Sequence, residues 1–143
     1  MKNISIVLLA AFCTFALFSC KENPEAAKQK SIDLMTTQTL GLAYLEEFKL
    51  DEAEKEFLKY IKLAPKEKLG YANLGLTYLR MGKYPEAEKR LLKAIEIDLK
   101  DPDTRLILAT VYQMNDQSEK AITELNKSLE FSPGHVKTLY DLS

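Results

Sequence analysis

The chain has 143 residues, and its 20 basic side chains nearly balance its 21 acidic ones, giving a net charge of −1. This balance lacks the basic excess that nucleic-acid binding needs, so the composition gives no support to a nucleic-acid partner. Two cysteines, one histidine and five scattered glycines supply neither a metal-ligand cluster nor a glycine-rich phosphate loop.

The first 19 residues have the pattern of a signal peptide. A basic start at Lys2 is followed by an apolar stretch from Ile4 to Phe18. This stretch of about 15 residues is shorter than the roughly 20 that a helix needs to span a bilayer. We therefore expect residues 1–19 to be removed after export, and a permanent transmembrane anchor is the alternative.

The end of this stretch, Leu17-Phe18-Ser19-Cys20, resembles the lipobox of bacterial lipoproteins. The resemblance implies cleavage before Cys20, which would carry covalent diacylglycerol on its sulfur and an N-acyl lipid such as palmitate. An ordinary signal peptide cut nearby, with Cys20 incidental, is the alternative. Lys21 differs from the aspartate that retains lipoproteins at the inner membrane in enteric bacteria, which favours the outer membrane, on its periplasmic face or at the cell surface.

After this processing no free thiol would remain, since Cys13 leaves with the signal peptide. We expect no cofactor apart from the lipid on Cys20. Residues 20–33 are polar up to Ile32, so we predict a lipidated N-terminus and a flexible tether. A tether of about a dozen residues reaches at most some 40 Å and would keep the domain near the membrane.

From Leu34 onward several residue types recur every 34 positions. The recurring residues are Ala53, Ala87 and Ala121, then Leu40, Leu74, Leu108 and Leu142, then Tyr44, Tyr78 and Tyr112. A period kept at many positions predicts a helical array. We divide residues 34–143 into units 34–67, 68–101 and 102–135 and a partial unit 136–143, with two helices in each full unit.

Glycine, proline and acidic residues indicate where these helices begin and end. Gly82 suits the left-handed end of a first helix, and Pro85 suits the first turn of the next. Phe48 and Asp116 occupy the positions that correspond to Gly82. We also expect two N-terminal caps, the first from Asp51, with Glu54 three residues later, and the second from Asp101, with Pro102 in the first turn.

The residues from 34 to 135 resemble the tetratricopeptide repeat (TPR), most closely in the second unit, YANLGLTYLRMGKYPEAEKRLLKAIEID. The resemblance implies an all-α, TPR-type α-solenoid of antiparallel helix pairs. Gly41, Gly75 and Ala109 would let the paired helices approach. Thr37 and Arg105 depart from the family where it prefers a large aromatic residue, and Tyr60 and Ser128 where it prefers a small one.

In this family the first helices line a concave groove that holds a peptide or helix of another protein. Carried over residue by residue, the groove positions are Leu42, Leu45, Leu69, Asn73, Leu76, Leu79, Leu106, Thr110 and Gln113, with Met35, Gln38, Glu46, Ala72, Arg80, Asp103 and Met114 beside them. The leucines predict an apolar groove that suits a partner with leucine-like anchors. Alternatively, residues 21–33 or a C-terminal continuation cover these leucines.

A carboxylate clamp of the chaperone-binding type is disfavoured. Of its positions only Asn73 matches, while Gln38, Leu42, Asp103 and Leu106 occupy the others. A catalytic pairing of Ser132 with His135 has no spacing signature, and turn hydrogen bonding is the simpler explanation.

We therefore predict a non-enzymatic interaction scaffold or adaptor of the bacterial cell envelope, held on the membrane by its lipid. Its partner would be another envelope protein that offers a peptide or amphipathic helix, and no small-molecule substrate is evident. Two alternatives stay open: the sensory or interaction part of a longer signalling or enzymatic protein, and a self-associating structural module.

Overall fold

The computed structural model describes residues 23–134, which form six α-helices and no strand. The predicted signal peptide 1–19, Cys20 and the partial unit 136–143 lie outside the described residues. The chain divides into two compact units, Met1–Ser31 and Ile32–Ser143. The helices are α2 (Pro24–Glu46), α3 (Leu50–Leu63), α4 (Lys68–Arg80), α5 (Tyr84–Ile97), α6 (Pro102–Met114) and α7 (Ser118–Phe131). The all-α prediction is confirmed.

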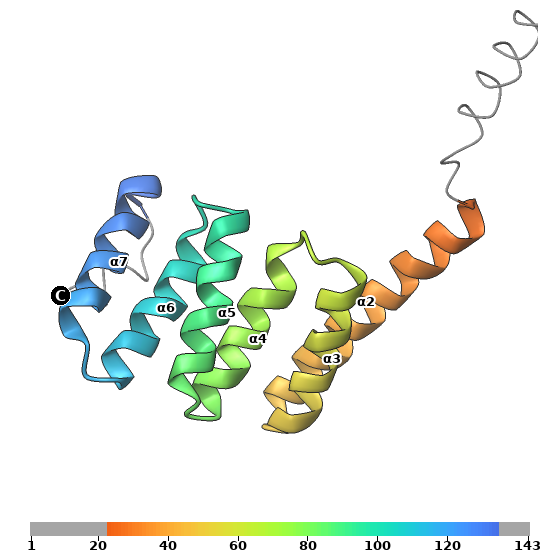
Figure 1. Ribbon diagram of the computed structural model, residues 1–143, viewed down its shortest axis with the longest axis horizontal. Helices are drawn as coiled ribbons and strands as arrows, with labels where there is room; N and C mark the ends of the chain where they lie inside the picture. The colour runs from red at the N-terminus through yellow and green to blue at the C-terminus, as the bar shows by residue number, and fades with distance from the viewer. Residues whose placement is uncertain (1–22, 135–143) are drawn as a thin grey trace, which may run out of the picture. The chain divides into compact units, whose positions relative to one another are not determined.

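From Ile32 onward the helices pack in chain order (Figure 1). Helix α4 packs on α5 and α6 on α7 within a repeat, while α3 contacts α4 and α5 contacts α6 between repeats. The first helices α4 and α6 also touch each other. This pattern of neighbours confirms the predicted succession of helix pairs.

The glycines of the first helices allow the close approach within each pair. A Cβ added at Gly41 would lie 2.6 Å from Cε1 of Phe57, and one at Gly75 would lie 2.5 Å from Cγ of Leu91. Both distances are shorter than two carbon atoms can approach without repulsion. The large residue of the second helix thus occupies the space that the missing side chain leaves.

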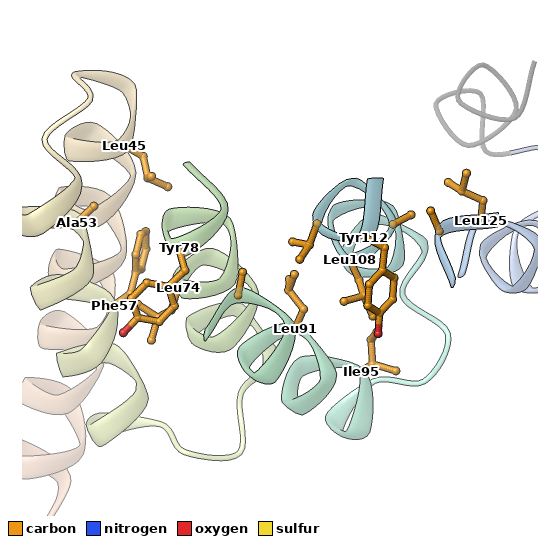
Figure 2. Close-up of a cluster of buried hydrophobic side chains, with 14 residues drawn as sticks. Leu45, Ala53, Phe57, Leu74, Tyr78, Leu91, Ile95, Leu108, Tyr112 and Leu125 are labelled. Atoms are coloured by element: carbon orange, nitrogen blue, oxygen red, sulfur yellow. The ribbon is translucent and has the colours of Figure 1, made fainter. Parts of the chain in front are cut away.

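The core repeats with the same period of 34 residues. Ala53, Ala87 and Ala121 are fully buried, and so are the large residues four positions later, Phe57, Leu91 and Leu125. Figure 2 shows Phe57, Leu74 and Tyr78 directed toward one another between α3 and α4. Burial of each large side chain stabilises the fold by roughly 1.5–3 kcal/mol, so the repeated core holds the first helices in register.

The three turns between paired helices share one backbone geometry. Gly82 has φ +72°, as predicted, and Phe48 and Asp116 adopt φ +57° and +56° at the corresponding positions. After each turn an amide donates to a tyrosine carbonyl, with Lys49, Lys83 and Gln117 bonded to Tyr44, Tyr78 and Tyr112 at 2.8–2.9 Å. Phe48 and Asp116 therefore adopt a left-handed backbone conformation that is strained for residues with a Cβ and that glycine adopts without strain.

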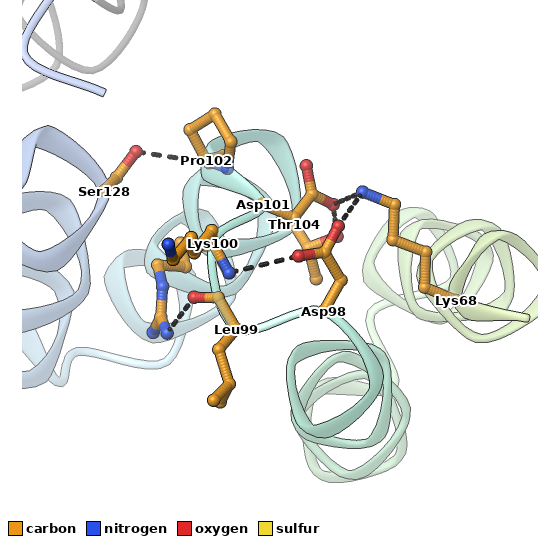
Figure 3. Close-up of polar contacts among 9 residues, drawn as sticks. Lys68, Asp98, Leu99, Lys100, Asp101, Pro102, Thr104 and Ser128 are labelled. Atoms are coloured by element: carbon orange, nitrogen blue, oxygen red, sulfur yellow. Dashed lines mark hydrogen bonds and ion pairs between the residues drawn. The ribbon is translucent and has the colours of Figure 1, made fainter. Parts of the chain in front are cut away.

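The predicted caps require correction. Helix α3 begins at Leu50 with Lys49 as its N-cap, so Asp51 lies inside the first turn. Asp101 does occupy the N-cap of α6, with Pro102 next, but its carboxylate accepts no backbone amide. Instead it accepts the Thr104 hydroxyl and lies 3.1 Å from the Lys68 ammonium, as Figure 3 shows. Both carboxylates still stabilise their helices, because each lies at the N-terminal end, where the helix dipole is positive.

The tether predicted for residues 20–33 also requires correction, because residues 24–33 are helical. Helix α2 begins at Pro24, ten residues before the predicted start. The Asn23 carboxamide accepts the Glu25 amide at 3.1 Å, and Pro24 fits the first helical position. This local cap and the good helix formers that follow it start a helix without any apolar period.

Candidate functional site

The candidate site is the surface formed by the first helices of the repeats, which we call the first-helix surface. It comprises eight of the nine predicted groove residues, all except Leu45, together with Met35 and Asp103. Three sets of predicted positions are related by the 34-residue period: Met35, Leu69 and Asp103; Leu42, Leu76 and Thr110; Leu45, Leu79 and Gln113.

Most of the predicted groove residues reach the surface. Leu42 is 38% exposed and Leu69 is 40% exposed. Gln113 is also exposed, whereas Asn73, Leu76, Leu79, Leu106 and Thr110 are half-buried. The half-buried leucines pack against the core cluster, so their outer edges alone are available to a partner.

Leu45 does not lie at the surface, contrary to the prediction. It is only 3% exposed and belongs to the core cluster. The neighbouring repeat also contacts its backbone, since Nη1 of Arg80 on α4 donates to the Leu45 carbonyl oxygen at 2.7 Å. Leu45 therefore packs in the core below the first-helix surface and does not contact a ligand on it.

The exposed apolar area is concentrated on the first two repeats. Met35 on α2 is 69% exposed, and Leu42 and Leu69 add to it. On α6 the corresponding positions are Asp103, Thr110 and Gln113, which are polar. Over α6 these polar residues lie beside the half-buried Leu106, and Met114 next to Gln113 is 59% exposed. The surface therefore carries more polar groups over α6 than over α2 and α4, but it is not wholly polar there.

Arg80 joins the first two repeats at the end of α4. Besides its bond to the Leu45 carbonyl, its guanidinium carbon lies 5.4 Å from the centre of the Phe48 ring. A cation over an aromatic face is attracted by the ring's negative charge distribution. Arg80 is exposed, so this contact fixes a cationic side chain at one edge of the first-helix surface.

Hydrogen bonds between repeats hold the first helices in position. The Tyr78 hydroxyl donates to Oε1 of Glu54 at 2.8 Å, and the Tyr112 hydroxyl donates to Oε1 of Glu88 at 2.9 Å. Burial, and after it the glutamate, raises the pKa of both tyrosines. The sequence revealed the recurrence of these tyrosines but no polar partner for them was predicted from it, although Glu54 and Glu88 are themselves 34 residues apart.

The third repeat contains a buried ion pair where the family prefers an aromatic residue. Nη1 of Arg105 lies 2.7 Å from Oε2 of Glu124, and Nη2 donates to the Leu99 carbonyl at 2.8 Å. The guanidinium carbon also lies 5.3 Å from the centre of the Phe131 ring. The pair compensates two charges that would otherwise be costly to bury, although the buried Nε of Arg105 has no hydrogen-bond partner.

Residues 23–134 contain no cluster of histidine, cysteine and acidic side chains suited to a metal ion. None of the helices in this range is long and apolar enough to cross a membrane. His135 lies outside the described residues, so the arrangement of Ser132 and His135 stays untested.

Comparison with known proteins agrees with the geometry. Two models of the tetratricopeptide repeat match residues 38–67 and 56–89. A search of curated proteins gives no significant match.

Solved structures of several TPR domains are similar. The second TPR domain of human RPAP3, in complex with the HSP70 peptide SGPTIEEVD, is 22% identical, with a TM-score of 0.73 over 79% of this chain and 94% of that one. The Arabidopsis OM64 TPR domain is 19% identical, with a TM-score of 0.73 over 78% and 92%.

A secretion chaperone provides a bacterial example. SycD, the type III secretion translocator chaperone of Yersinia enterocolitica, is 19% identical, with a TM-score of 0.70 over 76% of this chain and 82% of that one. These likenesses concern the fold. Residues 38–89 therefore match the tetratricopeptide repeat, and the described part of the chain has an all-α solenoid fold similar to that of TPR domains.

Proposed function

We propose that this protein is a non-enzymatic interaction module that holds a peptide or amphipathic helix of another protein on the first-helix surface. The observation that carries the proposal is the exposure of Leu42 and Leu69 on helices that the repeat core holds in register. The RPAP3 domains, whose structures hold HSP70 and HSP90 peptides, support this type of binding.

The side chains of the first-helix surface indicate which chemical groups its ligand carries. Met35, Leu42 and Leu69 suit leucine-like anchors, while Thr110 and Gln113 suit the hydrogen-bonding groups at the other end of a segment. A terminal carboxylate is not the expected anchor, because Leu42 and Leu106 stand where the chaperone-binding clamp has polar or basic residues. We propose an amphipathic segment that lies with its apolar end over α2 and α4.

Site-specific photo-crosslinking in the native envelope tests this function. A photoreactive residue placed at Leu42, Leu76 or Thr110 should crosslink one and the same partner segment. The control position is Leu92 on α5, which is 42% exposed and lies outside the first-helix surface. Crosslinks of equal yield from position 92, or none from the three surface positions, would contradict the proposal.

For the cellular site we propose a lipid anchor on Cys20 that holds the module in the bacterial envelope, with the outer membrane favoured and another envelope protein as the partner. The support is the lipobox-like sequence before Cys20. Two or three acyl chains at about 0.8 kcal/mol per buried CH2 hold a protein on a membrane stably.

Replacement of the lipidated residue tests the anchor. Cys20→Ser should abolish palmitate labelling and release the protein from the membrane fraction. Cys13→Ser is the matched control and should leave both unchanged. A Cys20→Ser protein that keeps its acyl label and its membrane association would contradict lipidation at this residue.

A further inference from the structure

A second surface, separate from the first-helix surface, lies between α2 and α3. It is a cleft of about 570 Å³ whose lining includes Thr36, Thr37 and Leu40 of α2 and Lys59, Lys62 and Leu63 of α3. We call it the α2–α3 cleft. Asp33 and Glu56 complete its lining, so two leucines share the cleft with polar and charged side chains.

The repeat period shows that this cleft is an unfilled packing position. Leu40 corresponds to Leu74 and Leu108, which are 34 and 68 residues further along the chain. Leu74 and Leu108 are 0% exposed, whereas Leu40 is 41% exposed. The leucine at this repeat position is thus buried in the second and third repeats and exposed to solvent in the first.

In the later repeats the cover is the second helix of the preceding repeat and the loop that follows it. A Cβ on Gly70 of α4 would lie 2.7 Å from Tyr60 and 2.8 Å from Ile61 of α3. The next side chain in each repeat binds that loop, since Tyr71 donates to the Pro65 carbonyl and Arg105 donates to the Leu99 carbonyl.

In the first repeat the corresponding residue, Thr37, is too short for such a bond. Its hydroxyl donates to the Leu34 carbonyl within α2. The side of α2 that carries Thr37 and Leu40, where the α2–α3 cleft opens, is therefore the position that a preceding second helix and its loop occupy in the later repeats.

The polar groups that receive such a helix are also present. Between the first and second repeats, the Tyr78 hydroxyl and the Lys83 ammonium both approach the Glu54 carboxylate, at 2.8 and 3.8 Å. Tyr44 and Lys49 occupy the equivalent positions one repeat earlier. Lys49 contacts Glu47 in an exposed pair, which costs little to exchange for another acid.

The two helices that fill this position have a common sequence. They read Ala-Glu-Lys-Glu-Phe at residues 53–57 and Ala-Glu-Lys-Arg-Leu at residues 87–91. The alanine permits the approach, the glutamate accepts the tyrosine hydroxyl, and the large residue enters the core. A helix suited to the α2–α3 cleft therefore carries a small residue, an acid next to it and a large apolar residue four positions after the small one.

This chain does not provide that helix in the regular register. The residues that lie 34 positions before Ala53 and Phe57 are Ser19 and Asn23, and α2 itself begins at Pro24. A second copy also fits poorly, because α7 has Ile122 where Glu54 and Glu88 accept the tyrosine. We propose that the α2–α3 cleft binds an amphipathic helix of a partner protein with the small–acid–large pattern.

A helix-stabilised, fluorescent peptide with the sequence of α5, YPEAEKRLLKAIEI, is the probe for this site. It should bind the full chain saturably in fluorescence polarisation. Leu40→Glu should weaken binding at least tenfold, and Leu92→Glu, at an equally exposed leucine of α5, should leave it unchanged. In the peptide, Leu91→Glu should abolish binding, and Glu88→Gln should weaken it less.

Further variants keep this inference distinct from the proposed function. Leu42→Glu, on the first-helix surface, should leave the affinity for the peptide unchanged, and circular dichroism should show that all variants remain folded. An absence of binding to the wild-type chain would overturn the proposal. So would equal binding by Leu40→Glu, or a loss of affinity in Leu42→Glu as large as that in Leu40→Glu.

Discussion

The Tyr78 hydroxyl donates a hydrogen bond to the Glu54 carboxylate at 2.8 Å, and the same bond recurs 34 residues later between Tyr112 and Glu88. Each bond joins the first helix of one repeat to the second helix of the repeat before it. The register of the repeats, and with it the first-helix surface, therefore depends on a polar contact as well as on core packing.

Removal of the Tyr78 hydroxyl should weaken this register. We expect Tyr78→Phe to lower the free energy of unfolding by about 1–2 kcal/mol, because a hydrogen bond to a carboxylate is lost while the ring stays. Urea unfolding measures the change. Tyr44→Phe is the control, since no repeat precedes it within residues 23–134, and an equal loss there would contradict the role assigned to the bond.

Stability should also fall in alkali because of these tyrosines. The fold raises the pKa of Tyr78 and Tyr112 above the ordinary value of 10.0, so folding favours their protonated form. This contribution is fully present below about pH 10 and is lost as the pH rises through the folded-state pKa.

Urea midpoints measured from pH 8 to pH 11.5 test this dependence. The wild type should lose stability above pH 10, and a double variant with Tyr78→Phe and Tyr112→Phe should lose less over the same range. Identical pH profiles for the two proteins would contradict the assignment.

Loss of glycine from one turn should destabilise the fold, and introduction of glycine into another should stabilise it. Gly82→Ala should cost about 1 kcal/mol through backbone strain alone, since nothing lies within 4 Å of an added Cβ and φ is +72°. Asp116→Gly should stabilise by up to about 1 kcal/mol, because Asp116 already adopts φ +56°.

Phe48→Gly should gain less than Asp116→Gly, since it also loses the contact with Arg80. Thermal melts rank the three variants. A Gly82→Ala protein as stable as the wild type would contradict the account of the turns.

The buried pair of Arg105 and Glu124 should be costly to break. Glu124→Ala leaves the guanidinium buried without its carboxylate, so we expect a loss of about 3 kcal/mol. Adding Arg105→Tyr, which introduces the residue found at Tyr71 in the second repeat, should restore much of the stability. Denaturant unfolding of both variants tests this, and a double variant no more stable than Glu124→Ala would contradict the explanation.

The sequence period was sufficient to place helices α3 to α7, because Ala53, Ala87 and Ala121 anchor equivalent second helices. It did not reveal the early start of α2. Residues 24–33 have no apolar face, and their helix depends on Asn23, Pro24 and local propensity, which a search for hydrophobic periodicity overlooks.

The candidate site was predicted less well than the fold. Leu42 and Leu69 are exposed as expected, but Leu45 is buried in the core cluster, and Arg80 of the next repeat binds its carbonyl oxygen. Such a contact joins residues 35 positions apart and follows from tertiary packing. The α2–α3 cleft was also missed, since comparing Leu40 with Leu74 required the exposure of each side chain.

The central claim is that a partner segment binds along the first helices, and methyl NMR tests it most directly. The segment captured by crosslinking would be synthesised and titrated into protein with labelled leucine methyl groups. We expect the methyl signals of Leu42, Leu69 and Leu76 to shift saturably, while that of Leu92 on α5 stays in place. Shifts confined to Leu92, or to leucines outside the first-helix surface, would contradict the claim.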